Sequence, residues 1–399
     1  MSQNRPIGRY AKLGKGVGQN QTIWSYGRQV SRNRNIMIEV TENITRLVPY
    51  SPGKPIEEVE RELGITGIIK LASNENSLGP SPKAIEAVNK LAEKMHIYPD
   101  ANCFALRQAV SEAIGVPGEC LVFGNGSDDI IHLLGITFLG ECDEVIQGDP
   151  SFVRYEAAAI LNNAKVHFVP LTKDWVHDLN AMAAKVNPRT RLIFIANPNN
   201  PTGTIVTRQA LEQFLEGLPE HVIVVLDEAY FEYAESEPDY PNGLDYVLQG
   251  RNVVVLRTFS KTYGLAGHRI GFGAMKPEIA QWLNRTREPF NVNYMAQYAA
   301  AAAIQDKDHV SNTVAMNEAG KKAFYQAFAE LGMEYTPTFG NFVWFDTKQD
   351  SREMFQKLLL KGVITRTGDV FGSPTYLRVT IGTEAENRKF LSALKEIAG

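Results

Sequence analysis

The residues best suited to chemistry lie in one stretch of the chain, residues 253–273. The apolar, β-branched run Val253–Leu256 predicts a buried strand, which leads into Ser260 and Lys261. Arg269 follows eight residues after the lysine, beyond a glycine-rich turn. A lysine fixed at the end of a strand can condense with an aldehyde, while nearby hydroxyls and the arginine hold a phosphate on the same molecule. Pyridoxal 5'-phosphate (PLP) fits this description.

A Ser-Lys pair followed by glycines is a weak signal by itself, because most loop lysines are simply solvated. A second stretch strengthens it. Asp227 ends the apolar run Val222–Leu226, and a carboxylate at a strand end can keep a pyridine nitrogen protonated. Tyr230, three residues later, can donate to the phenolic oxygen of the same ring. The alternative for Asp227 is a cap for the next helix.

Three further groups could contact a flat phosphorylated ring. Asn200 sits in an Asn-Pro-Asn-Asn-Pro-Thr-Gly turn after the apolar run Leu192–Ala196, and its amide can donate to the phenolic oxygen. The backbone N–H groups of 126–128 (Gly-Ser-Asp) open a predicted helix and can bind a phosphate. Phe152 can stack on the ring. Each group also has an ordinary structural interpretation when it is taken alone. Asn200 could lie in a plain turn, residues 126–128 could cap a helix, and Phe152 could be a core aromatic.

Composition excludes several other classes of protein. The net charge is −4 and the pI about 6.0, so the whole molecule offers no basic field for nucleic acid. Three cysteines in no C-x-x-C arrangement argue against a disulfide framework and favour a reducing compartment, so we expect a cytoplasmic protein. The histidine spacing gives no support for a metal site. No apolar run approaches the ~18 residues that span a bilayer.

The order of elements predicts an α/β protein of two lobes. Strands that are apolar on both faces alternate with helical patterns, which indicates a mainly parallel sheet between helices. Ligands of such sheets bind beyond the carboxyl ends of the strands. Residues 277–331 have a long helical pattern that should carry the chain into a smaller αβ domain. We expect a basic, disordered tail at 1–36, an arm at 37–80, the large domain at 81–288, and the linking helices with the small domain at 289–399.

The basic tail has two other interpretations. Residues 1–36 are arginine-rich and acid-free, as in transit peptides, although serine is sparse. Met37 could also be the working start of the protein.

In their order and spacing, these motifs resemble those of the fold-type I PLP-dependent aminotransferases. The resemblance runs from about Tyr50 to the C-terminus and includes Gly-Asn-Gly-Ser-Asp, Asn-Asn-Pro-Thr-Gly, Asp-Glu-Ala-Tyr and Ser-Lys. It is greatest to the histidinol-phosphate aminotransferases, through Leu-Ala-Ser-Asn-Glu-Asn at 71–76, Tyr-Pro-Asp at 98–100 and Leu-Arg-Val-Thr-Ile-Gly-Thr at 377–383. It implies a large domain with a mainly parallel seven-stranded sheet between helices, and a smaller αβ C-terminal domain.

The resemblance also implies a role for individual residues. Lys261 would carry the cofactor and later move a proton, with Asp227 and Tyr230 as the other catalytic groups. The cofactor-binding set would be Gly126, Ser127, Asp128, Phe152, Asn200, Asp227, Tyr230, Thr258, Ser260, Lys261 and Arg269. Tyr98 would reach the cofactor phosphate from the other subunit of a homodimer. Tyr50, Asn74, Arg366 and Arg378 would bind substrates, with Arg378 on the carboxylate of glutamate or 2-oxoglutarate.

The implied reaction moves an amino group from histidinol phosphate to 2-oxoglutarate, giving imidazole acetol phosphate and glutamate. Two positions depart from the family's pattern, and the first of them bears on the substrate. Thr367 stands where the family commonly has proline, and Phe152 where many members have tyrosine. An aromatic amino acid aminotransferase or a phospho-amino-acid decarboxylase of the same fold therefore remains an alternative. A non-catalytic PLP-binding regulator is disfavoured by the retained lysine.

Overall fold

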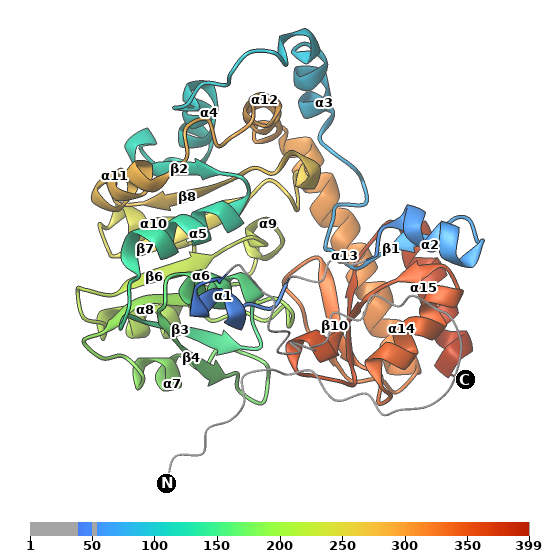
Figure 1. Ribbon diagram of the computed structural model, residues 1–399. Coiled ribbons are helices and arrows are strands. Elements are labelled where there is room, and N and C mark those ends of the chain that lie inside the picture. Colours follow the sequence, from blue (N-terminus) through green and yellow to red (C-terminus); the bar gives the residue numbers. More distant parts are fainter. Residues whose placement is uncertain (1–38, 50–53, 399) are drawn as a thin grey trace.

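The computed structural model describes residues 39–49 and 54–398 (Figure 1). The expected disorder of the tail 1–36 and the substrate role of Tyr50 lie outside the described residues. Of the N-terminal arm, helix α1 (Glu42–Arg46) lies against the large domain, where Asn43 Nδ2 donates to the Leu161 carbonyl over 2.8 Å. Helix α2 (Ile56–Leu63) and strand β1 (Ile69–Lys70) lie with the small domain.

The large domain is built on a seven-stranded sheet, as predicted. Its order is β2-β8-β7-β6-β5-β3-β4, and every neighbouring pair is parallel except those that involve β8. The strands are β2 (Leu121–Gly124), β3 (Glu144–Asp149), β4 (Lys165–Pro170), β5 (Thr190–Ala196), β6 (Ile223–Asp227), β7 (Val253–Thr258) and β8 (Gly271–Met275). Among the described residues the sheet is therefore mainly parallel, and its two antiparallel pairings, β2 with β8 and β8 with β7, lie towards the β2 edge.

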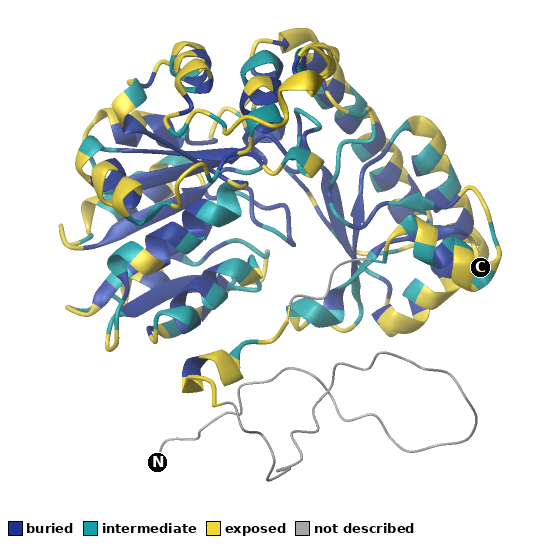
Figure 2. Ribbon diagram, turned by 45° about the horizontal axis from the view of Figure 1, so that its top comes forward, coloured by how far each residue is buried: buried dark blue, intermediate teal, exposed yellow. Residues whose placement is uncertain are grey.

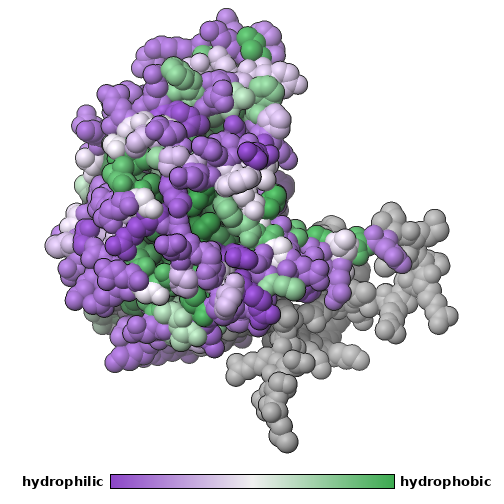
Figure 3. Space-filling model, turned by 90° about the vertical axis from the view of Figure 1, so that its left-hand side faces the viewer, coloured by the Kyte–Doolittle hydropathy of each residue, from purple (hydrophilic) through white to green (hydrophobic). Residues whose placement is uncertain are grey.

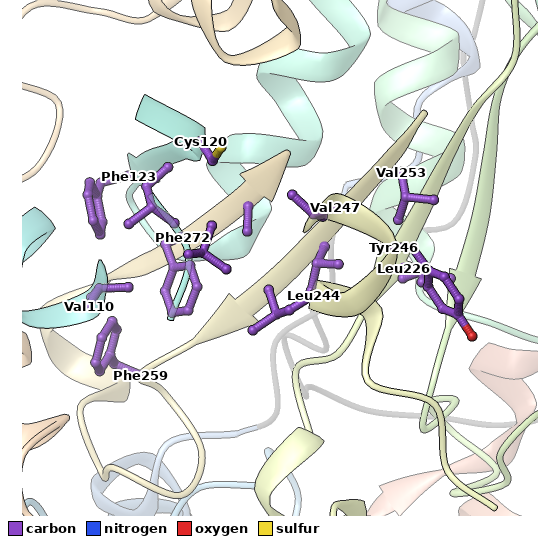
Figure 4. Close-up of a cluster of buried hydrophobic side chains, with 14 of the residues drawn as sticks. Val110, Cys120, Phe123, Leu226, Leu244, Tyr246, Val247, Val253, Phe259 and Phe272 are labelled. Atoms are coloured by element: carbon purple, nitrogen blue, oxygen red, sulfur yellow. The ribbon is translucent and has the colours of Figure 1, made fainter. Parts of the chain in front are cut away.

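Apolar residues on both faces of this sheet explain why helices cover both sides. Along β6, Val224 and Leu226 face one core, whereas Ile223 and Val225 face the other. The first core contains the side chains drawn in Figure 4 and is closed by helices α3, α4, α7, α8, α10 and α12. The second is closed by α5, α6 and α11. Figure 2 shows the strands buried and the outer helix faces exposed.

The helices that close these cores have the following bounds: α3 (Pro82–Asn89), α4 (Phe104–Ile114), α5 (Ser127–Phe138), α6 (Val153–Leu161), α7 (Leu179–Ala183), α8 (Arg208–Glu216), α10 (Gly243–Leu248), α11 (Pro277–Thr286) and α12 (Tyr294–Ala303). A short helix, α9 (Phe231–Ala234), follows β6.

The small domain contains a four-stranded antiparallel sheet in the order β12-β13-β10-β9. Its strands are β9 (Tyr335–Thr336), β10 (Phe342–Asp346), β12 (Arg366–Thr367) and β13 (Tyr376–Thr380). Strand β1 pairs in parallel with β11 (Val363–Ile364), which joins the arm to this domain. Helices α13 (Lys307–Glu330), α14 (Ser351–Leu360) and α15 (Glu384–Ala398) pack around a core that includes Phe324, Phe345 and Phe390.

The long helical pattern at 277–331 forms three helices, not one. Turns at 287–293 and 304–306 separate α11, α12 and α13. Helix α12 packs on α3 and α4 in the large-domain core, so α13 alone carries the chain across to the small domain (Figure 1). Helix α3 ends at Asn89, and a short 3-10 turn, η1 (Ala92–Lys94), follows it.

Two surface features need a brief description. The face of the large domain in Figure 3 is mostly hydrophilic, with hydrophobic residues in small separate patches. In the part of the chain that the structure describes, no helix is both long and apolar enough to cross a membrane.

Candidate active site

The predicted site residues gather at the carboxyl ends of neighbouring strands. Asp227 is the last residue of β6, and Lys261 follows the end of β7 by three residues. Asn200 follows β5, which lies on the other side of β6. Because parallel strands end at the same edge of a sheet, these three side chains converge on one site.

The Lys261 amine lies inside this site and not in open solvent. Its Nζ donates to the Ser73 carbonyl over 3.1 Å and lies 5.7 Å from the centre of the Tyr230 ring. Burial, and to a smaller extent the Arg378 charge, lower the pKa of Lys261 to about 8. Arg269 adds to this effect, whereas Glu75 and Asp227 oppose it. Near neutral pH, a fraction of this amine is therefore uncharged and basic.

Asp227 is a buried carboxylate with two fixed hydrogen bonds. The Tyr155 hydroxyl donates to Oδ2 over 2.7 Å, and the Ala229 backbone N–H donates to Oδ1 over 3.2 Å. Burial raises the pKa of Asp227 to about 6, although both hydrogen bonds act to lower it. A cationic partner in the site would compensate this buried negative charge.

Tyr230 and Asn200 are held by groups from other parts of the chain. The Asn74 amide Nδ2 donates to the Tyr230 hydroxyl over 2.8 Å. Asn200 Oδ1 accepts from Arg378 Nη1 over 2.5 Å, which leaves the Nδ2 of Asn200 as the group that can donate to a ligand. Arg378 also donates through Nη2 to the Ala72 carbonyl over 2.6 Å. Asn74 is thus buried and bound to protein groups.

Beside the lysine, several donors form a site for an anion. Helix α5 begins at Ser127, and its cap Gly126 provides no side-chain acceptor for the first N–H groups. The Thr258 and Ser260 hydroxyls lie 3.0 Å apart, and the Ser260 N–H donates to the Thr258 oxygen over 3.1 Å. A Cβ on Gly126 would lie 2.8 Å from Arg269 Nη2, so the guanidinium packs against this glycine.

The positive charge at this anion site is that of Arg269. Arg269 donates to the Ala266 carbonyl over 3.1 Å, and no carboxylate among the described residues pairs with it. Asp128, in contrast, is occupied, because its carboxylate accepts from Arg154 Nε over 2.6 Å. Asp128 can therefore offer its backbone N–H, and not its carboxylate, to a bound anion. The Arg269 guanidinium lies at the positive end of α5, and this combination favours a phosphate.

The remaining predicted residues lie further apart. The Phe152 ring packs edge-on against Tyr155, with 5.6 Å between their centres. Arg366 lies on β12 directly opposite Arg378 on β13. Tyr98 is 78% exposed and stacks on Phe290, whose ring centre is 4.9 Å away. In the described part of the chain, no hydrogen bond or ring contact joins Tyr98 to the residues of the anion site.

Sequence reasoning missed several groups that hold the site together. Tyr155, Ser73, Thr380 and Asn341 all bond to predicted site residues or to their backbone. A signal existed for Tyr155, which lies three residues after Phe152, the N-cap of α6, and packs against its ring. The others could be found only once the small domain and the arm were placed against the large domain.

These residues fit PLP. The donors at the start of α5, the two hydroxyls and Arg269 suit its phosphate, while the buried amine suits its aldehyde and the buried carboxylate its ring nitrogen. In the described residues no cluster of three or more possible metal ligands occurs.

This fold, with such a lysine and carboxylate at its strand ends, defines a fold-type I PLP-dependent aminotransferase. The chain belongs to the aminotransferase class I and II family, whose model matches residues 66–394. It is 53% identical over 357 residues to the histidinol-phosphate aminotransferase of Moorella thermoacetica, covering 89% of this chain and 92% of that one. Its identity to histidinol-phosphate aminotransferase 2 of Carboxydothermus hydrogenoformans is 46%, over 90% of this chain and 99% of that one.

A solved structure agrees with these relatives. The histidinol-phosphate aminotransferase of Sinorhizobium meliloti, in complex with PLP, superposes with a TM-score of 0.84 at 26% identity. The match covers 92% of this chain and 99% of that chain.

Proposed function

We propose that the protein transfers the amino group of histidinol phosphate to 2-oxoglutarate, giving imidazole acetol phosphate and glutamate. The observation that carries the reaction type is the buried Lys261 amine beside the buried Asp227 carboxylate and the anion site at α5. The choice of amine is supported by relatives of up to 53% identity that are histidinol-phosphate aminotransferases.

Different residues would bind different parts of the cofactor. Gly126, Ser127 and Asp128 would bind its phosphate through backbone N–H groups. Thr258, Ser260 and Arg269 would add two hydroxyls and a positive charge, and Phe152 would pack on the ring. Asp227 would pair with the ring nitrogen, and Tyr155 keeps that carboxylate in place. Tyr230 and Asn200 would donate to the phenolic oxygen.

Bound PLP supplies an electron sink that lets the α-proton of the amine substrate leave. Lys261 is the group that moves this proton. Its lowered pKa of about 8 leaves part of the released amine neutral at physiological pH, as a general base requires. Arg378 would hold the carboxylate of glutamate or 2-oxoglutarate, and Arg366 with Tyr50 would hold the phosphate of histidinol phosphate.

We also propose a homodimer with shared sites. Large exposed apolar side chains lie on helices α3, α4 and α12, which pack together, and on the loops beside them. They are Ile85, Met95, Ile97, Tyr98, Phe104, Phe290 and Tyr298. Such a patch on a large-domain surface is typical of a subunit interface. Tyr98 would reach the cofactor phosphate of the other subunit. Sedimentation of the wild type should give a dimer. Tyr98→Phe should weaken cofactor binding, and the variant should still sediment as a dimer.

A cytoplasmic location is the last part of the proposal. The three cysteines form no disulfide, and Cys103 and Cys120 are buried as thiols. Thiols of this kind suit a reducing compartment.

The decisive experiment compares absorption spectra of the purified protein and of Lys261→Ala, before and after amino donors are added. The wild type should bind PLP, and its absorption spectrum should change when histidinol phosphate is added. Lys261→Ala should not convert histidinol phosphate. Assays with histidinol phosphate, phenylalanine and threonine phosphate then separate the candidate reactions. No turnover of histidinol phosphate would remove the proposed substrate, whereas loss of phosphothreonine carboxylate would indicate a decarboxylase.

A further inference from the structure

Asn74 occupies an unusual position in the turn that follows β1. It is 1% exposed, and its φ of 56° lies in the left-handed region, which asparagine adopts more readily than most residues. Its contacts join three parts of the chain. They reach Tyr230 in the large domain, Thr380 at the end of β13, and Asn341 just before β10.

The hydrogen bonds around Asn74 have a fixed direction. The Asn74 backbone N–H donates to Thr380 Oγ1 over 3.0 Å. The proton of that hydroxyl is then directed to Asn74 Oδ1, 3.2 Å away. Because Oδ1 faces the threonine, Nδ2 must face Tyr230, where it donates to the hydroxyl oxygen over 2.8 Å. The single proton of Tyr230 is therefore directed at some group other than Asn74.

We propose that Asn74 and Thr380 are positioning residues that point the Tyr230 proton at the phenolic oxygen of PLP. This inference rests on the proposed function, since it assumes that PLP binds at this site. It gives Asn74 a role through Tyr230 in place of the expected direct contact with substrate. The turn is well held for this purpose, because Asn341 Nδ2 donates to the Asn74 carbonyl over 3.0 Å.

The surroundings of Tyr230 make this direction matter. Lys261 Nζ lies over the Tyr230 ring, Asp227 lies three residues before it, and Phe342 packs edge-on against it from the small domain. A hydrogen bond to a charged oxygen favours its deprotonated form. A correctly directed Tyr230 should therefore lower the pH at which the lysine-bound cofactor loses its proton.

The test is a pH titration of the visible absorbance of the cofactor-loaded protein, without amine substrate. Asn74→Gly removes the amide but tolerates the left-handed backbone. Thr380→Val removes the hydroxyl that orients the amide. Each should raise the titration midpoint by about 0.5–1 pH unit, the size expected when one hydrogen bond to a charged group is weakened. Thr380→Ser keeps the hydroxyl and should restore the wild-type midpoint.

Two controls separate this role from a structural one. Thr336→Val makes the same change at a buried threonine on the edge strand β9 and should leave the midpoint unchanged. In a Tyr230→Phe background, Asn74→Gly and Thr380→Val should cause no further shift. An equal shift in that background would overturn the proposal, and so would an unchanged midpoint with a raised KM for the amine.

The design remains decisive in two difficult cases. If Asn74→Gly does not fold, which thermal unfolding would show, Thr380→Val beside Thr380→Ser still tests the direction of the hydrogen bonds. Because no amine is present, the midpoint stays informative even if histidinol phosphate is not the substrate. A protein that binds no PLP would instead contradict the proposed function itself.

Discussion

Arg366 on β12 lies directly opposite Arg378 on β13, so the two side chains leave the same face of the small-domain sheet. Like charges in directly opposed positions repel each other. Negative charge on a ligand at this face would offset that repulsion. In the proposed reaction the phosphate of histidinol phosphate would reach Arg366, and a carboxylate of 2-oxoglutarate would reach Arg378.

The first prediction concerns Arg366. If it binds the substrate phosphate, Arg366→Ala should lower kcat/KM for histidinol phosphate roughly 100-fold, because a charge-assisted contact is lost. Turnover of phenylalanine, which has no phosphate, should change by about threefold or less. Steady-state kinetics with both amines measures this difference. Arg388→Ala, on the exposed face of α15, is the control and should leave both values unchanged. Equal losses for both amines would exclude a phosphate-specific role.

The second prediction concerns the buried amine in the cofactor-free protein. The folded-state pKa of Lys261 is about 8, below its ordinary value of 10.5. Between these values the unfolded chain binds a proton that the folded chain does not, so stability rises with pH across this window. At pH 7 the amine is mostly charged in both states, so the folded protein retains most of the cost of burying that charge.

Lys261→Met removes this charge and keeps the length of the side chain. At pH 7 the variant should therefore be more stable than the wild type by on the order of 1–2 kcal/mol, and the difference should shrink towards pH 10. Urea unfolding of both cofactor-free proteins at the two pH values gives the comparison. A difference that grows with pH would show that the amine is not disfavoured in its charged form.

The third prediction uses two buried tyrosines of opposite character. Tyr155 donates to Asp227, whereas the Tyr246 hydroxyl has no hydrogen-bond partner among the described residues. Tyr155→Phe leaves a buried carboxylate with one donor fewer, so it should cost about 1–3 kcal/mol of unfolding free energy and weaken PLP binding. Tyr246→Phe should be neutral or slightly stabilising. Chemical unfolding and a PLP titration distinguish the two variants, and equal costs would contradict a special role for Tyr155.

The strands that position the site could be predicted because their residues are apolar on both faces. Val253–Leu256 and Val222–Leu226 match β7 and β6 within two residues, and these strands deliver Lys261 and Asp227. Strand β8 was missed, since Gly-Phe-Gly-Ala-Met lacks the usual β-branched pattern. The structure explains the first glycine of β8, Gly271. A Cβ on Gly271 would lie 2.5 Å from the Ser127 backbone nitrogen, so β8 and the start of α5 approach too closely for a side chain.

Contacts between distant segments were beyond sequence reasoning. Asn74 and Thr380 are 306 residues apart, and no local pattern relates them. The break between α11 and α12 was also not foreseen, although Pro289 lies within it. Local propensity thus predicted the elements and the strand-end residues, whereas the residues that hold those side chains came from packing between the arm and the two domains.

The last prediction concerns Gly126 and uses a second glycine as its control. Both Gly126 and Gly115 have a positive φ, of 80° and 70°, so alanine should cost each about 1 kcal/mol of stability. Their surroundings differ. A Cβ at Gly115 meets nothing within 4 Å, whereas one at Gly126 would push on the Arg269 guanidinium from 2.8 Å. The end of an arginine side chain can move aside, so the extra cost in stability should be small.

The cost should appear in cofactor binding, because the displaced guanidinium is the positive group of the anion site. We expect Gly126→Ala to raise the Kd for PLP roughly tenfold or more, and Gly115→Ala to leave it unchanged. Absorbance titrations of the cofactor-free proteins measure both constants, and urea unfolding checks that the two variants lose similar stability. If Gly126→Ala bound PLP as tightly as Gly115→Ala, the phosphate would have to be held elsewhere. Neither Gly126 nor Arg269 could then be assigned to phosphate binding.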